Sequence, residues 1–148
     1  MCIINNSGRQ ESKSNMHNIL LAGVSPVWLE TAVASGYDIG ERNESTKITA
    51  SAKRMMEDLE SYKETTFEEK FLTPDNQEDW KSFMALLKSK RWDCITLGGG
   101  VRTIPQLGDY FTELVHAIMK EQPQATLIFP LLPEDVVPAL KKYYPQAK

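Results

Sequence analysis

Two short segments of the 148-residue chain carry residues whose types and spacing suit chemistry. In the first, residues 98–103 read Gly-Gly-Gly-Val-Arg-Thr, so glycines that admit a ligand close to the backbone precede a fixed cation and a hydroxyl. A helix beginning at this segment adds free N–H groups, and the whole set suits a carboxylate, phosphate or enolate oxygen. In the second, Tyr37 and Asp38 lie between two glycines without an evident structural role. An aspartate and a tyrosine near an arginine can exchange protons with a small carbonyl compound.

These two segments predict one ligand site. The structural alternatives are a plain strand-to-helix turn for the glycine run, and a structural lid or a dimer contact for the long connection at residues 25–44. Cys94 is expected to be a small buried hydrophobe, and His116 a surface or interface residue. The predicted catalytic residues are Asp38, Tyr37 and Arg102, and the predicted ligand-binding residues are Ser25, Trp28, Gly98, Gly99, Gly100, Arg102 and Thr103.

Strands that alternate with helices must position these residues. Continuous apolar runs predict buried strands, a partly alternating run predicts an edge strand, and apolar residues at helical spacing predict helices. Ser45 or Thr46 can cap the first helix, Asp75 with Glu78 can cap the second, and Pro138 either kinks the last helix or marks its later start. The predicted strands are 19–24, 67–72, 92–97 and 125–131, and the predicted helices are 45–62, a segment after Asp75 containing Trp80 to Leu87, 103–119 and 133–143.

This order of elements predicts a single three-layer α/β/α domain at residues 17–148, of the Rossmann or flavodoxin type. Its four-stranded parallel sheet should have the strand order 2-1-3-4, with helices on both faces. Ligands bind such sheets at the carboxyl ends of the strands, where the strand order reverses between strands 1 and 3. Residues 25–44 and 98–103 follow those two strands and should therefore meet. The polar residues 1–16 are predicted to form a flexible tail.

Composition and missing motifs exclude several classes of protein. The chain has 17 Lys and Arg against 20 Asp and Glu, a net charge of -3, which argues against nucleic acid as a partner. Two unclustered cysteines, no signal-peptide pattern and no long apolar run predict a soluble, cytoplasmic protein without a metal site or a membrane segment. Neither GxGxxG nor a P-loop follows the first strand, so we expect no cofactor.

Several motifs in the second half of the chain occur together: an aromatic-Asp-Cys strand start at 92–94, the Gly-Gly-Gly-x-Arg turn at 98–102, Phe111 in a helix, Pro123-Gln124-Ala125, and Pro133-Glu134-Asp135 with Ala139-Leu140. With these motifs, residues 90–143, and more loosely the strand at 19–24, resemble a group of small, largely uncharacterised microbial α/β proteins. The resemblance implies a single-domain Rossmann-like, flavodoxin-like fold and emphasises residues 98–102. It implies no particular activity.

The function predicted from these features is the binding of a small molecule by an α/β protein. The leading hypothesis is a cofactor-independent enzyme of the lyase, isomerase or cyclase type, acting on a small carbonyl or anionic substrate at the carboxyl edge of the sheet. One alternative is a non-catalytic ligand-sensing or protein-interaction domain, and another is a degenerate nucleotide-binding or oxidoreductase module. The expected partner is a small-molecule ligand, and a homodimer is left open.

Overall fold

Four parallel strands form the single sheet of the computed structural model, which describes residues 16–145. The strand order is β2-β1-β3-β4, so the predicted topology is confirmed. All but the last residue of the predicted tail, 1–16, lies outside the described residues. The strands are β1 (His17–Val24), β2 (Thr65–Leu72), β3 (Cys94–Leu97) and β4 (Thr126–Ile128).

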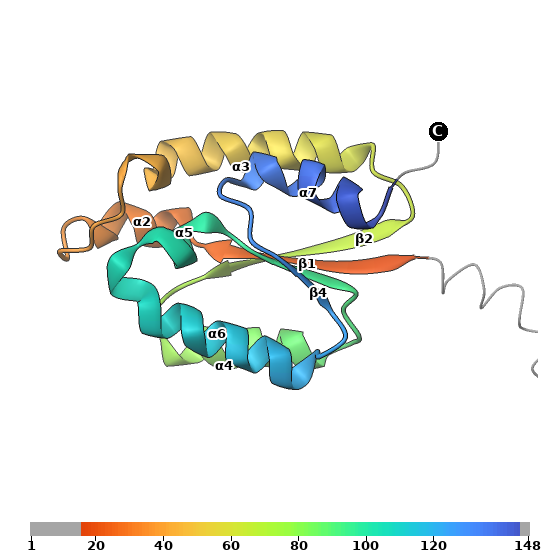
Figure 1. Cartoon of the computed structure of the whole chain (residues 1–148). Helices are drawn as coiled ribbons and strands as arrows, with labels where there is room; N and C mark the ends of the chain where they lie inside the picture. The colour runs from red at the N-terminus through yellow and green to blue at the C-terminus, as the bar shows by residue number, and fades with distance from the viewer. Residues whose placement is uncertain (1–15, 146–148) are drawn as a thin grey trace, which may run out of the picture.

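Helices cover both faces of the sheet, which gives the predicted three layers (Figure 1). Successive strand residues point to opposite faces, so Ile19 and Leu21 pack in one core while Leu20 and Ala22 pack in the other. The residues of β1 that point to either face are therefore apolar because both faces of the strand are buried. The first core is covered by α3 (Ser45–Glu60) and α7 (Val136–Tyr143), and the second by α4 (Gln77–Lys88) and α6 (Gly108–Glu121).

The connection after β1, predicted as one loop, contains a helix, α2 (Pro26–Ala32), and a short 3-10 helix, η1 (Glu41–Asn43). The Ser25 hydroxyl caps α2 by accepting hydrogen bonds from the backbone N–H groups of Val27 and Trp28. Pro26 supplies the preset φ angle of the first helical position. Both signals are in the sequence, but a helix of 7 residues is too short to show an apolar period.

The predicted single helix at 103–119 is wrong in its start and its continuity. The chain forms α5 (Gly99–Thr103), a 3-10 turn η2 (Pro105–Leu107) and then α6. Ile104 has extended backbone angles, φ -85° and ψ 115°, because a residue that precedes proline is disfavoured in the helical region. Gly99 and Gly100 therefore lie inside a helical turn rather than ahead of the helix, and Gly98 is its extended N-cap residue.

Two predicted caps are also wrong. Asn76, not Asp75, caps α4, because its side-chain oxygen accepts the N–H of Asp79 at 2.8 Å, whereas Asp75 has a positive φ of 59°. Neither Ser45 nor Thr46 caps α3, since the cap position belongs to Glu44, which makes no side-chain cap bond.

The predicted strand 125–131 and the predicted last helix both have later or shorter bounds in the structure. β4 covers only Thr126–Ile128, ahead of the buried Pro130. The last helix consists of a 3-10 turn, η3 (Pro133–Asp135), followed by α7. Pro138 consequently lies in the first turn of α7, where proline is tolerated, so the later start is the correct alternative.

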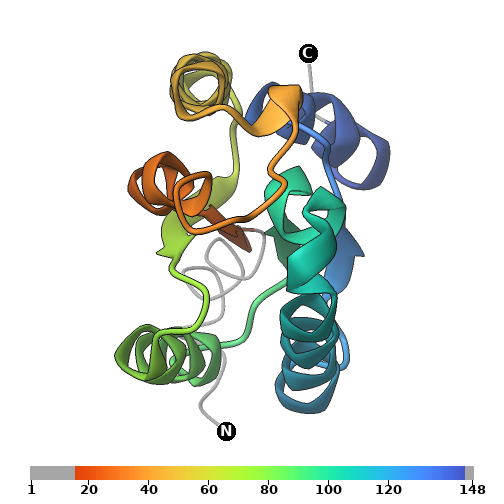
Figure 2. The ribbon, with the colours of Figure 1, turned by 90° about the vertical axis from the view of Figure 1, so that its left-hand side faces the viewer.

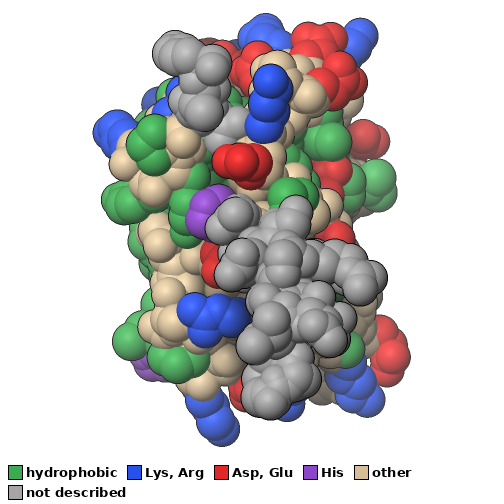
Figure 3. Space-filling view, turned by 90° about the vertical axis from the view of Figure 1, so that its right-hand side faces the viewer, with side chains coloured by type: hydrophobic (Ala, Val, Ile, Leu, Met, Phe, Trp, Pro, Cys, Tyr) green, Lys and Arg blue, Asp and Glu red, His purple; other side chains and the backbone are tan. Residues whose placement is uncertain are grey.

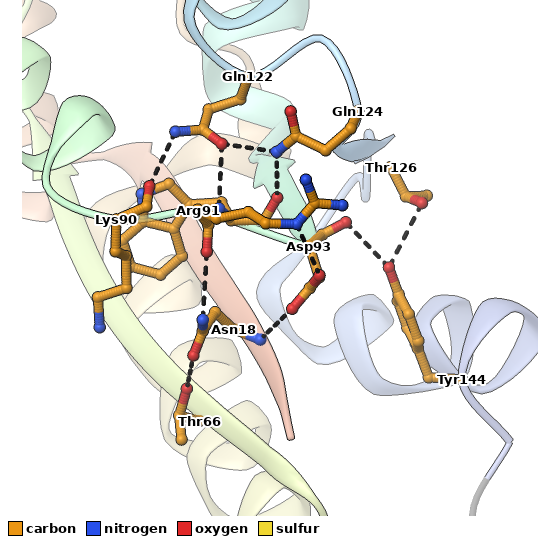
Figure 4. A network of polar contacts seen from close by, with 10 residues as sticks. Asn18, Thr66, Lys90, Arg91, Asp93, Gln122, Gln124, Thr126 and Tyr144 are labelled. Carbon is orange, nitrogen blue, oxygen red and sulfur yellow. Dashed lines mark hydrogen bonds and ion pairs between the residues drawn. The ribbon is translucent and has the colours of Figure 1, made fainter. Parts of the chain in front are cut away.

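A polar network closes the amino edge of the sheet (Figure 4). The buried side chain of Gln122 uses its whole amide: the oxygen accepts from the backbone N–H of Trp92 and from Gln124, and the nitrogen donates to the carbonyls of Leu87 and Lys90. Tyr144 ties the end of α7 to the same edge by donating to the Asp93 carbonyl at 3.0 Å. These amide groups are saturated by the chain itself, which is the pattern of structural polar groups.

The outer surface at this amino end carries charged side chains of both signs on its visible described part. In the space-filling view of this end, basic and acidic side chains are interspersed over the part that the described residues form (Figure 3). Among the described residues, this edge holds no buried side-chain polar atom without a hydrogen-bond partner.

Candidate functional site

The connection between α2 and α3 crosses the carboxyl edge of the sheet and passes between α2 and α5 (Figure 2). Two side-chain amides hold it there. Gln106 receives the backbone N–H of Asp38 at 3.1 Å and donates to the Gly36 carbonyl at 3.2 Å. Asn43 donates to the Ile39 carbonyl at 2.8 Å. The loop after β1 and the segment after β3 are thus joined, as the topology predicts.

The predicted catalytic residues Tyr37, Asp38 and Arg102 make contacts in different parts of this edge. The Tyr37 hydroxyl donates to Asp75 Oδ2 at 2.8 Å, and this hydrogen bond to a carboxylate raises the pKa of Tyr37. The Arg102 guanidinium is exposed and donates to the Phe129 carbonyl at 3.3 Å, at the end of β4. Within residues 16–145, no hydrogen bond or ion pair links these three side chains.

Two further predicted ligand-binding residues have structural partners. Ser25 caps α2, as described above, and its own backbone N–H donates to the Leu72 carbonyl at 2.8 Å. Trp28 packs edge-on against Tyr37, with ring centroids 4.8 Å apart. Both residues therefore hold α2 and the loop together at this edge.

The three predicted glycines have three different environments. Gly98 continues the sheet by donating its N–H to the Ala22 carbonyl at 2.8 Å. A Cβ at Gly99 would lie 2.1 Å from the Leu131 carbonyl oxygen, so the chain's own β4–η3 loop occupies that space. A Cβ at Gly100 would meet Asn43 Oδ1 and the Val24 side chain at 3.5 Å. Close approach by the protein itself explains Gly99, and Gly100 borders the site that follows.

Asn43 is the residue at this edge whose side chain does not have all of its hydrogen-bonding groups paired. Its exposed fraction is 2%, and its amide nitrogen donates twice, to the Ile39 carbonyl and to Thr103 Oγ1. Thr103 in turn donates to the Gly99 carbonyl at 2.8 Å. Because both carbonyls can only accept, this chain of bonds fixes the direction of the Asn43 amide. Its oxygen, Oδ1, is the one buried side-chain polar atom of the described residues without a hydrogen-bond partner.

A narrow cavity, which we call the slot, runs between the sheet and α3 and has a volume of about 60 Å³. It exists because Gly23 of β1 and Gly98 of β3 are neighbours, with only 3.4 Å between the Cα of Gly23 and the place of a Cβ at Gly98, and neither carries a side chain. Apolar side chains of α3 and α7 form its roof, among them Ile48, Met55 and Val136. Asn43 forms part of its wall.

Polar side chains enter the slot from the sheet. Thr96 of β3 is 2% exposed and lines the slot. Glu69 of β2 lies in register with Leu21, which lies in register with Thr96, so all three lie in one row of the sheet. Partial desolvation of the carboxyl raises the pKa of Glu69, which is otherwise exposed, and no ion pair engages it among residues 16–145.

A wider and more polar hollow, which we call the basin, lies on the other side of Asn43 and has a volume of about 770 Å³. Its charged side chains are mixed in sign, and two exposed ion pairs join some of them: Lys47 with Glu41 at 3.6 Å and Arg54 with Glu134 at 3.1 Å. The side chains of Arg42 and Asp38 make no ion pair within the described ranges. The charged side chains that line the basin are Asp38, Glu41, Arg42, Lys47, Arg54 and Glu134.

Nucleophiles and metal ligands are not gathered at this edge. Burial, and then the charge of Asp93, raise the pKa of the Cys94 thiol to about 12, so this buried cysteine stays protonated, in agreement with the prediction. His116 is exposed on α6. Within residues 16–145, no three His, Cys, Asp or Glu side chains form a group that could hold a metal ion, and no helix has the length and apolar character to cross a bilayer.

The slot residues Gly23, Asn43, Glu69 and Thr96 are not among the predicted site residues. Gly23 carries a signal that the sequence contains, because a glycine within a buried strand often marks a close approach or a space. Asn43 carries none, since its partners lie at positions 39 and 103 and only the fold brings them together. No protein-family model, curated protein or solved structure matches the chain.

Proposed function

We propose that the protein binds a small organic molecule at the carboxyl edge of its sheet, with one end of the molecule in the slot. The observation that carries the proposal is the unpartnered oxygen of Asn43. A buried acceptor without a donor costs about 1–3 kcal/mol, so a stable fold retains one where something else supplies the donor. Gln122 at the opposite edge gives the comparison for a purely structural role, because both the oxygen and the nitrogen of its amide have hydrogen-bond partners within the protein.

Binding, rather than catalysis, is the part of the predicted function that this geometry supports. Acid–base chemistry needs the acid and the base within hydrogen-bond reach of one reacting group. Tyr37 donates to Asp75, and Arg102 donates to the end of β4, so neither is directed at Asp38 in the basin. We therefore propose a ligand-binding protein, the first of the predicted alternatives to an enzyme.

Blocking the slot tests the proposal. The probes are a set of neutral, cationic and anionic molecules of up to about eight heavy atoms, added to 15N-labelled protein, with amide shifts as the readout. We expect at least one probe to shift the amides of Gly23, Gly98 and Gly100. Gly23→Val should abolish these shifts, because the nearest atom to a Cβ at Gly23 is 3.9 Å away and the added side chain fills open space in the slot.

Gly108→Val is the matched control, since a Cβ at Gly108 meets nothing within 4 Å and lies at the start of α6, outside the slot. This variant should bind the same probes as the unmodified chain. A dispersed amide spectrum of Gly23→Val shows that it is folded. Absence of any probe-induced shift at the slot, or equal binding by Gly23→Val, overturns the proposed function.

A further inference from the structure

The polar atoms that side chains present to the slot are hydrogen-bond acceptors at both of its ends. At the inner end, Asn43 Oδ1 can only accept, since the amide nitrogen is held by Ile39 and Thr103. At the outer end, β2 contributes the Glu69 carboxylate, beside the exposed ring of Phe71. The Thr96 hydroxyl lies between them and can act in either role.

The charge of the slot is negative. Among the basic residues that the structure describes, only Lys70 lines it, and the Lys70 ammonium forms an ion pair with Asp79 Oδ1 at 2.7 Å. Glu68 and Lys70 alternate with Glu69 along β2, so their side chains point to the opposite face of the strand. An anion in the slot would therefore meet the Glu69 carboxylate with no side-chain cation to offset it.

The two ends differ in exposure, and this decides which donor each can take. Asn43 is 2% exposed, so a full charge placed beside its neutral oxygen would lose its hydration for a single hydrogen bond. A neutral hydroxyl donor fits there. Glu69 is exposed, so an ammonium ion beside it keeps water on one side and gains a charge-assisted hydrogen bond on the other.

Resting on the proposed function, we propose that the ligand is a short linear amino alcohol, with its hydroxyl on Asn43 and its ammonium on Glu69. Glu69 and Thr96 lie on β2 and β3, two strand spacings apart across the sheet, roughly 10 Å, so a ligand that reaches from the Glu69 carboxylate across the slot to the β3 side needs an aliphatic chain of about five carbons. The slot volume of about 60 Å³ is less than half of the ~150 Å³ cavity that admits benzene, so only the hydroxyl end and part of an unbranched chain fit inside it, and the ammonium lies at the mouth of the slot beside the exposed Glu69.

Four probes of equal length test this assignment: 5-amino-1-pentanol, pentylamine, 1-pentanol and 5-hydroxypentanoate. Amide shifts on titration give each dissociation constant. We expect 5-amino-1-pentanol to bind best, and removal of either its hydroxyl or its ammonium group to weaken binding about tenfold, the loss of one good hydrogen bond. The hydroxypentanoate, which reverses the charge, should not bind in the slot.

Paired variants assign the ammonium to its partner. Glu69→Gln should reduce the affinity for 5-amino-1-pentanol to that for 1-pentanol, while leaving 1-pentanol unchanged. Glu68→Gln is the matched control, because Glu68 is the preceding residue of β2 and pairs with Lys90 away from the slot. It should leave all four affinities unchanged.

Each other outcome refutes a stated claim. Preferential binding of 5-hydroxypentanoate shows that the slot recognises anions, through the backbone N–H groups of Gly99 and Gly100, and overturns the amino-alcohol assignment while the proposed function stands. Equal binding of pentylamine and 5-amino-1-pentanol removes the role of Asn43 in the assignment. If no probe of any charge class shifts the slot amides, the proposed function fails as well.

Discussion

Replacing Gly99 by alanine should destabilise the protein far more than the same change at its neighbour Gly100. The two residues are adjacent in α5, so helix propensity and the entropy of the unfolded chain favour both substitutions by a similar amount, up to about 1 kcal/mol. They differ in what a Cβ would touch. At Gly99 it would lie 2.1 Å from the Leu131 oxygen and 2.8 Å from the Leu131 carbonyl carbon, whereas at Gly100 the nearest atoms lie at 3.5 Å.

The size of the effect follows from these distances. Ordinary contacts of a Cβ begin at 3.4 Å, so the Leu131 carbonyl must retreat by at least about 1.3 Å. That carbonyl is backbone between Pro130 and Pro133, and the loop cannot yield by a side-chain rotation. Overpacking of this kind costs roughly 1–3 kcal/mol, occasionally more, and exceeds the gain from propensity. We expect a net loss of about 2 kcal/mol for Gly99→Ala and a small gain for Gly100→Ala.

Urea unfolding measures this difference. The fluorescence of Trp92, which is 1% exposed, and the helical circular dichroism should report one transition. With a slope of about 2 kcal/mol per molar urea, the midpoint of Gly99→Ala should fall by about 1 M relative to the unmodified chain. Equal midpoints for the two variants would refute the reasoning, because they would show that the β4–η3 loop does not approach Gly99 as closely as the structure has it.

Two further predictions concern groups away from the slot. Asp79→Ala should cost about 3–5 kcal/mol in urea unfolding, because it removes the partner of the largely buried Lys70 ammonium, 2.7 Å away, and the acceptor of the Thr73 N–H. The double variant with Lys70→Met should recover the part of the loss that comes from the unpaired ammonium, and no recovery would contradict an ion-pair origin. In a Cys2→Ser background at pH 8, native Cys94 should react with iodoacetamide about 10³ times more slowly than Cys94 of the unfolded chain, since its pKa of about 12 lies three units above the ordinary 9.0. The folded thiol keeps its proton above pH 9, where the unfolded thiol loses its own, so the free energy of unfolding should decline as the pH rises above 9. Native reactivity equal to that of the unfolded chain would contradict the burial of the thiol.

The topology could be predicted from the sequence because a strand that is buried on both faces has a continuous run of apolar residues. The run from Ile19 to Val24 is apolar at nearly every position, and only a covered parallel strand requires that. The failures concern short elements. α2 has 7 residues and α5 has 5, too few for an apolar period, and α5 begins with two glycines that favour helix least. Packing of Leu131 against Gly99 and of Val101 in the core holds that turn where propensity does not.

The location of the candidate site could be predicted, but most of its chemistry could not. Parallel topology alone brings the segments after β1 and β3 to one edge, and Gly98 to Gly100 do border the slot. The roles of Arg102 and Tyr37 depended on side-chain directions, which are set by partners distant in sequence, Phe129 and Asp75. Residue type shows what a side chain can do, but only the fold shows which of its hydrogen-bonding groups are already used.

Asn43 and Gln122 make this point with the same functional group. Both are buried carboxamides, 2% and 7% exposed, and both join segments far apart in the chain. The oxygen of Gln122 accepts hydrogen bonds from the protein and its nitrogen donates to the protein, so replacing Gln122 would affect the amino edge alone. In Asn43 only the nitrogen donates to the protein, and these two hydrogen bonds hold the loop to α5, while the oxygen makes none. A ligand hydroxyl in the slot would donate to the Asn43 oxygen, as the Trp92 N–H donates to the oxygen of Gln122. The nitrogen of Asn43 would then serve the fold, and its oxygen would serve ligand binding.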